Sequence, residues 1–104
     1  MSGEGFPSAQ GAAVGEPTPD CRPAIGPGFR LQWEEVQGCH VLLYPEGMVK
    51  LNGSAGEILK RCDGQRTLGE IVADLEAAFA PQDLGADVTG FVAVAAKQRW
   101  LRWA

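Results

Sequence analysis

Apolar and polar residues alternate in the segment that leads to the middle of the chain. Phe29, Leu31 and Trp33 fall on one side of an extended backbone, and polar residues occupy the positions between them. This alternation predicts a β-strand with one buried side. The segment Val36-Gln37-Gly38 predicts a turn, and the β-branched and aromatic residues from His40 to Tyr44 predict a second strand.

A tight turn at Pro45-Glu46-Gly47 is expected to lead into a third strand. Proline presets φ for a type I turn, and we expect the glycine to take the positive φ of a bulge residue. The resulting register places Leu43 opposite Val49 and Val41 opposite Leu51, so that one face of the hairpin is aliphatic. The other face is mixed and carries Tyr44, Met48, Lys50, His40 and Asn52.

The second half of the chain shows the spacing of α-helices. Two capping boxes, Ser54-Ala55-Gly56-Glu57 and Thr67-Leu68-Gly69-Glu70, predict helix starts, because the hydroxyl and the carboxylate of each box satisfy free backbone donors. Apolar residues recur at helical spacing after both boxes and predict two stripes that face the core. The residues of the first stripe are Ala55, Ile58, Leu59 and Cys62, and those of the second are Leu68, Ile71, Val72, Leu75 and Phe79. Asp63-Gly64 predicts the end of the first helix in a left-handed conformation, and Pro81 predicts the end of the second.

A third helix is expected from about Asp83 or Asp87 to Gln98. The segment from Trp100 to Trp103 alternates, so it is either a last helical turn or a terminal β segment. The order β-β-β-α-α-α predicts an α+β, winged-helix-like fold. In this fold a three-stranded antiparallel sheet is followed by three helices that cover its aliphatic face.

The length of the chain, 104 residues and 11.0 kDa, leaves room for one small domain without a deep active-site cleft. Residues 1–22 are rich in Gly, Pro, Ala and Ser and have no hydrophobic period, so we expect a disordered tail. The alternative is an arm that docks on a neighbouring molecule. Residues 23–104 are expected to form the domain.

The net charge argues against nucleic acid as a partner. The formal charge is −4 and the isoelectric point is about 4.8, whereas phosphate binding requires a basic surface. A winged-helix DNA-binding protein is the main alternative class, but the expected second helix, Leu68 to Phe79, carries acidic residues and no basic one. No apolar run approaches the roughly 20 residues of a membrane span, and there is no signal peptide, so we expect a cytoplasmic protein.

The sequence offers no cluster of residues for catalysis or metal binding. Cys21, Cys39 and Cys62 are odd in number and widely spaced, which argues against a disulfide framework and a C-x-x-C zinc site. Cys39 and His40 are neighbours, and neighbours on a strand point to opposite faces, so they suit neither a shared metal ion nor a nucleophile-base pair. We expect reduced thiols, no metal, no cofactor and no enzymatic activity.

A series of turn and cap motifs occurs in a specific order and spacing between about Arg22 and Leu101. The motifs are Pro45-Glu46-Gly47, Leu51-Asn52-Gly53, Ser54 to Leu59, Cys62-Asp63-Gly64, and Thr67 followed by Glu70-Ile71-Val72 and Leu75. Together they resemble the PqqD family of pyrroloquinoline quinone (PQQ) biosynthesis. This family is the founding type of the recognition element for precursors of ribosomally synthesised and post-translationally modified peptides (RiPPs).

The resemblance implies a peptide chaperone. Members of the family bind the precursor peptide PqqA and present it to PqqE, a radical S-adenosylmethionine (SAM) enzyme that cross-links a glutamate to a tyrosine. In relatives the precursor adds as a strand beside the third strand, in a groove walled by the third helix. The residues that this implies for peptide binding are Gly47, Met48, Val49, Lys50, Leu51, Asn52, Val88, Phe91, Val92, Ala95 and Arg99. The alternative within the same fold is recognition of another ribosomally made modified peptide.

The third strand is expected to be an open edge, and an open edge is a template for another chain. The predicted register directs the backbone groups of Val49 and Leu51 outward to the peptide, and those of Met48 and Lys50 toward the second strand. The same edge can pair with a second copy, so a homodimer is an alternative state of the peptide-free protein.

The region after the third helix departs from the family pattern. Relatives usually have a glycine just before the last aromatic-aliphatic pair, where this chain has Arg99 ahead of Trp100-Leu101. The long N-terminal tail is not part of the family pattern either.

Overall fold

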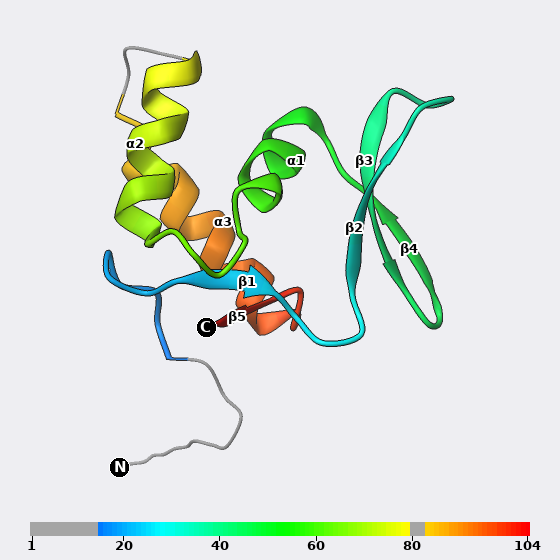
Figure 1. The fold of residues 1–104 in the computed structure, drawn as a ribbon, viewed down its shortest axis with the longest axis horizontal. Coiled ribbons are helices and arrows are strands. Elements are labelled where there is room, and N and C mark those ends of the chain that lie inside the picture. Colours follow the sequence, from blue (N-terminus) through cyan, green and yellow to red (C-terminus); the bar gives the residue numbers. More distant parts are fainter. Residues whose placement is uncertain (1–14, 80–82) are drawn as a thin grey trace.

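The computed structural model describes residues 15–79 and 83–104. The strands are β1 (Pro23–Ile25), β2 (Arg30–Glu34), β3 (Cys39–Tyr44), β4 (Gly47–Lys50) and β5 (Leu101–Trp103), and the helices are α1 (Gly53–Lys60), α2 (Leu68–Phe79) and α3 (Gly85–Lys97). β2, β3 and β4 form an antiparallel sheet in that order, and β1 pairs with β5 in a separate two-stranded sheet (Figure 1). The predicted α+β fold is confirmed, although β1 was not expected.

The turn between β3 and β4 is one residue shorter than the sequence suggested. Tyr44 pairs with Gly47, so only Pro45 and Glu46 form the turn. Gly47 is not among the glycines with a positive φ. The prediction of a bulge at Gly47 was therefore wrong, because this glycine is the first paired residue of β4.

This shorter turn changes which residues share a face of the sheet. Leu42 lies opposite Val49, and Val41 lies opposite Lys50, so the expected aliphatic face does not form. One face carries Phe29, Leu31, Trp33, His40, Leu42, Tyr44, Val49 and Leu51. The other carries Arg30, Gln32, Glu34, Cys39, Val41, Leu43, Met48 and Lys50.

The first of these faces packs on α1. A Cβ atom at Gly56 of α1 would lie 2.8 Å from Nδ1 of His40, which shows how closely the helix approaches β3. The second face, which we call the outer face, points away from α1. The helix therefore covers the side that carries most of the aromatic residues. On the outer face Met48 and Lys50 are exposed, whereas Val41 is buried, with 2% of its surface exposed.

The starts of two helices test the predicted capping boxes. The side-chain oxygen of Asn52 accepts a hydrogen bond from the backbone N–H of Ala55 at 2.8 Å, so Asn52 and not Ser54 is the N-cap of α1. The box at α2 is confirmed. The backbone N–H of Thr67 donates to Oε1 of Glu70 at 2.8 Å, and the N–H of Glu70 donates to Oγ1 of Thr67 at 3.1 Å.

The turn after α3 contains a residue with a left-handed backbone, Arg99, whose φ is 69°. The N–H of Arg99 donates to the carbonyl of Ala96 at 3.0 Å, and the N–H of Trp100 donates to the carbonyl of Ala95 at 2.9 Å. These two bonds form a Schellman motif, in which the left-handed position usually holds glycine. The chain then continues as β5, so the segment from Trp100 ends in a strand and not in a further helical turn.

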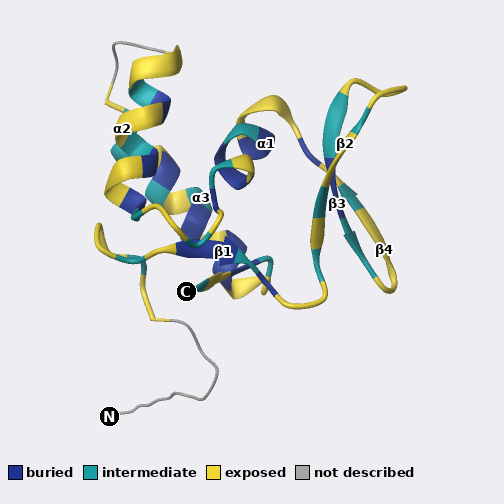
Figure 2. Ribbon diagram, viewed as in Figure 1, coloured by how far each residue is buried: buried dark blue, intermediate teal, exposed yellow. Residues whose placement is uncertain are grey.

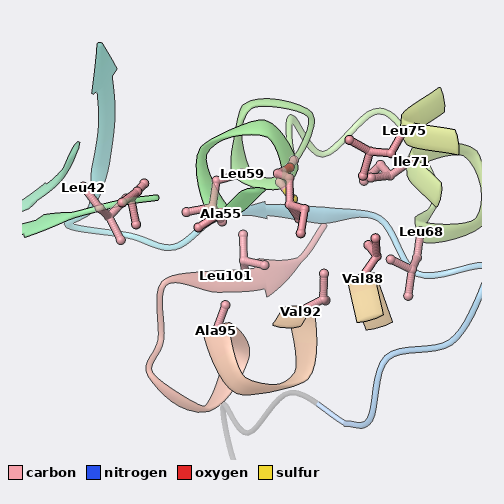
Figure 3. Packing of buried hydrophobic residues seen from close by; sticks show 13 residues of the cluster. Leu42, Ala55, Leu59, Leu68, Ile71, Leu75, Val88, Val92, Ala95 and Leu101 are labelled. Carbon is pink, nitrogen blue, oxygen red and sulfur yellow. The ribbon is translucent and has the colours of Figure 1, made fainter. Parts of the chain in front are cut away.

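α1 lies between the three-stranded sheet and the other two helices (Figure 1). The expectation that all three helices cover this sheet was wrong, because β5 pairs with β1 and holds the end of α3 beside the second sheet. The buried residues gather where the helices meet (Figure 2). Figure 3 shows this core, which joins Leu42 of β3 to Leu59 of α1, Ile71 of α2, Val92 of α3 and Leu101 of β5.

Residues 15–22 lie against the domain, although the sequence assigned them to the tail. The carbonyl of Cys21 accepts a hydrogen bond from Leu68 N–H at 2.8 Å, and the carbonyl of Pro19 accepts one from Gly69 N–H at 3.0 Å. The indole N–H of Trp103 donates to the carbonyl of Gly15 at 3.1 Å. The boundary at residue 22 stays a prediction, and residues 1–14 lie outside the described residues.

Candidate functional site

Within the described residues, β4 is an edge of the three-stranded sheet, because the strand order is β2-β3-β4 and β4 pairs with β3 alone. The N–H of Leu51 donates to the carbonyl of His40 at 3.0 Å, so Leu51 directs its backbone toward β3. Backbone direction alternates along an antiparallel strand, which means that Val49 also points inward. Met48 and Lys50 therefore direct their N–H and C=O groups outward, and the prediction that Val49 and Leu51 do so was wrong.

The side chains of Met48 and Lys50 project from the outer face at this edge. Met48 is 52% exposed, and Lys50 is exposed as well. Val49 points to the other face, where it is half-buried against the core. The residues with free backbone groups are therefore the same residues whose side chains face solvent.

An apolar cleft lies beyond the end of β4, between the three helices, with a volume of about 640 Å³. Its lining comes from the start of α1, the end of α2 and the first half of α3. The residues that line it are Asn52, Gly53, Ser54, Ala55, Glu57, Ile58, Leu75, Phe79, Leu84, Asp87, Val88 and Phe91. Asn52 caps α1 two residues after β4, so the cleft begins close to the point where the strand ends.

Ion pairs hold α1 and α2 together beside this cleft. The Arg61 guanidinium contacts the Glu57 carboxylate at 2.8 Å and also donates to Asp74 of α2. It lies over the ring of Phe79 at 5.7 Å from the centroid. Hydrogen bonds from Arg61 and then Lys60 hold the pKa of Glu57 below its ordinary value, so this carboxylate at the cleft stays ionised at neutral pH.

The strand residues implied by the resemblance occupy the edge and its end. Gly47, Met48, Val49 and Lys50 form β4. Leu51 is buried in the core, and only 5% of its surface is exposed. Leu51 therefore anchors the end of the strand in the core, and its part in peptide binding stays a prediction.

The helix residues implied by the resemblance fall into different environments. Val88 and Phe91 line the cleft, together with Asn52. Val92 and Ala95 are buried in the core and point toward Leu101 (Figure 3). Arg99 is exposed in the turn after α3. The part these residues play in peptide binding stays a prediction.

Several cleft residues were not singled out from the sequence. Phe79 was placed on the core stripe of its helix, but it is 58% exposed at the mouth of the cleft. Ile58 and Leu75 were also placed on core stripes, and they line the cleft while remaining buried. Phe79 lies in the last turn of α2, beyond the residues of this helix that are buried in the core. This place at the helix end is the sequence signal that could have identified Phe79 as a cleft residue.

The described residues contain no cluster of three or more His, Cys, Asp or Glu side chains that could hold a metal ion. Burial raises the pKa of the Cys62 thiol to about 12, and a thiol in this state is a poor nucleophile. Its Sγ lies 3.2 Å from the Ile58 carbonyl, one helical turn away. In the parts of the chain that the structure describes, no helix has the length and apolar character needed to cross a bilayer.

The fold and the edge together define a small α+β, winged-helix-like module with an open strand beside an apolar cleft. The profile of the family described as coenzyme PQQ synthesis protein D (PqqD) matches residues 39–101, from β3 to the start of β5. The chain therefore belongs to the PqqD family.

Relatives with about half of their residues identical support this membership. The chain is 51% identical over 86 residues to the PqqA binding protein of Pseudomonas aeruginosa (strain UCBPP-PA14), which covers 82% of this chain and 94% of that protein. It is 50% identical over 80 residues to the PqqA binding protein of Stutzerimonas stutzeri (strain A1501), which covers 76% and 87% of the two chains.

A solved structure has the same fold. It is the solution NMR structure of the PqqD truncation of Methylobacterium extorquens PqqCD, described as a functional and stand-alone RiPP recognition element. The two chains share 35% identity with a TM-score of 0.63, over 77% of this chain and 87% of the other.

Proposed function

We propose that this chain is a peptide chaperone of PQQ biosynthesis, which binds the precursor PqqA by strand addition to β4 and presents it to the radical SAM enzyme PqqE. Its relatives carry the name PqqA binding protein at about 50% identity, and the related NMR structure is a RiPP recognition element. The observation in this chain that carries the proposal is the open edge of β4.

The free backbone groups of Met48 and Lys50 supply the affinity in this proposal. An extended peptide that pairs with an edge strand makes main-chain hydrogen bonds, and its alternate side chains then fill pockets. The two outward residues of β4 offer up to four such groups. Beyond Lys50 the backbone turns inward at Leu51 and the helix α1 begins, so the added strand ends there.

The apolar cleft gives the peptide a second point of contact. A chain that leaves the end of β4 passes Asn52 and reaches the wall formed by Val88 and Phe91. Aromatic and aliphatic side chains are the ligands that such a lining favours. Strand addition fixes only a few residues of the precursor, so the remainder stays free to enter the active site of PqqE. No chemistry is assigned to this chain itself.

Backbone N-methylation tests strand addition, because it removes one N–H and keeps the side chain. In semisynthetic protein, we expect N-methylation of Lys50 to weaken PqqA binding by about 1–3 kcal/mol, the usual penalty for an unmatched hydrogen-bonding group. Calorimetry with the wild-type and modified chains measures the difference.

N-methylation of Val49 is the matched control, since its N–H points toward β3. This change should lower the stability of the hairpin, which urea unfolding detects. A folded wild-type chain that shows no heat of binding to PqqA would overturn the proposed function. Equal effects of the two modifications on PqqA affinity would rule out strand addition to β4 and would indicate that the peptide binds in another way.

A further inference from the structure

The edge of β4 presents two side chains, Met48 and Lys50, on the same face and two residues apart. Their outward backbone groups and their outer-face side chains follow from the observed register. A peptide residue opposite Lys50 in an added strand must also project onto the outer face, because residues that pair across strands share a face. This holds whether the peptide runs parallel or antiparallel to β4.

Lys50 supplies a positive charge at this edge. Directly opposite residues in paired strands have Cβ atoms about 4.5–5.5 Å apart, within reach of an ion pair. Among residues 15–79 and 83–104, Lys50 belongs to none of the ion pairs that the structure forms. The chain as a whole carries a formal charge of −4, so it repels an acidic peptide except where a cation lies close by.

Met48 supplies an apolar surface at the neighbouring position. Its side chain is 52% exposed, and its partner across the sheet is Leu43, which is half-buried. A thioether side chain is flexible and makes favourable contacts with aliphatic and aromatic groups. The peptide residue between these two positions turns to the opposite face, beside Val49.

From this geometry we infer a recognition rule, which rests on the proposed function and specifies its peptide. The bound segment carries a carboxylate opposite Lys50 and an apolar or aromatic residue opposite Met48, with one residue between them. Lys50 and Met48 are therefore specificity-determining residues, and the backbone edge provides affinity that does not depend on sequence.

Charge reversal on both partners tests the rule. The variant Lys50→Glu places like charges opposite each other, and we expect it to weaken binding of PqqA by about three- to tenfold. A set of PqqA peptides in which each Asp or Glu is replaced in turn by Lys is then titrated against both proteins. One substitution should restore binding to Lys50→Glu to within about twofold of the wild-type pair.

Arg30→Glu is the matched control. Arg30 is exposed on the same outer face, but it belongs to β2, and strands are about 4.8 Å apart, so it lies about 10 Å from β4. We expect this variant to change affinity by less than about twofold at moderate salt. Circular dichroism and urea unfolding show whether both variants are folded.

The peptide position at which Lys restores binding to Lys50→Glu also locates the peptide residue that lies opposite Met48. That residue should be two positions before or after it in the peptide and should be apolar. Its replacement by Asp should weaken binding to the wild-type protein. The rule is overturned if Lys50→Glu binds PqqA as Arg30→Glu does, or if no charge reversal in the peptide compensates. Failure of the wild type to bind PqqA would instead remove the proposed function, and the recognition rule with it.

Discussion

At the scale of single residues, Arg99 occupies a backbone position that suits glycine better. Its φ of 69° is left-handed, and a residue with a Cβ atom loses roughly 1–2 kcal/mol in that conformation. Gly26 is adapted to the same turn. Its N–H donates to the Trp100 carbonyl at 2.7 Å, and a Cβ atom there would overlap the carbonyl oxygen of Arg99.

We predict that Arg99→Gly stabilises the protein. The relief of the left-handed strain exceeds the added entropy of a glycine in the unfolded chain, about 0.5–1 kcal/mol, so the net gain should be about 0.5–1 kcal/mol. Urea unfolding measures this gain. Lys97→Gly, in the last turn of α3, is the control and should lower stability by about 1 kcal/mol. A loss of stability in Arg99→Gly would mean that the arginine side chain contributes more than its backbone loses.

At the scale of elements, polar contacts fix where α2 starts and how it sits against α1. The backbone N–H of Thr67, and then its hydroxyl, hold the pKa of Glu70 below its ordinary value of 4.5. A hydrogen bond from Arg61 likewise lowers the pKa of Asp74 from its ordinary value of 3.8. Both carboxylates favour the folded state when they are ionised.

These directions predict a loss of stability in acid. A carboxylate whose pKa is lower in the folded state contributes its full stabilisation above the unfolded pKa, and the contribution is lost as the pH falls through the folded pKa. For Glu70 the loss should begin as the pH falls past 4.5. The urea midpoint, measured between pH 7 and pH 3, should therefore fall less steeply in Glu70→Gln, which keeps a capping side chain without the charge.

Glu35→Gln is the control for this comparison, because Glu35 is exposed in the loop between β2 and β3. We expect its urea midpoint to follow the wild type at every pH. The assignment of the acid sensitivity to the α2 cap fails if Glu70→Gln and Glu35→Gln show the same slope.

At the scale of the whole molecule, the segment of residues 15–22 forms hydrogen bonds with the start of α2 and with the C-terminal end of the chain. Residues 15–22 supply the carbonyls of Pro19 and Cys21 to the first N–H groups of α2, and the carbonyl of Gly15 to the indole of Trp103. The N–H of Ala104 donates to the carbonyl of Arg22 at 2.8 Å, so this segment also joins the end of the chain. It thus links α2 and β5, which are far apart in the sequence.

We predict that a chain beginning at Pro23 is less stable than a chain beginning at Gly15. The shorter chain loses the acceptors for two helix N–H groups, for the Ala104 N–H and for the Trp103 indole. Four hydrogen bonds are worth about 2–6 kcal/mol together. Thermal or urea unfolding of the two chains provides the comparison. Identical unfolding midpoints would show that water replaces these carbonyls without loss.

The sequence by itself determined the kinds and order of the three strands β2 to β4 and the three helices, whereas it did not reveal β1 and left the segment that became β5 open. Periodicity and caps are local properties, so the Thr67–Glu70 box and the helix after it were predicted correctly. Val36-Gln37-Gly38 was also a turn, as expected. The same local motifs supported membership of the PqqD family, and the family profile bears this out.

Only the tertiary structure decided the register, the packing of the helices and the free backbone groups. The local sequence permits a turn of two residues or one of three. Packing against α1 selects between them, because a shift of one residue exchanges the two faces of the strand. Pairing of β1 with β5 depends on contacts between the two ends of the domain, which no local pattern encodes. Met48 and Lys50 therefore replace Val49 and Leu51 as the residues with outward amides, because packing against α1 requires Leu42 and Leu51 to face inward.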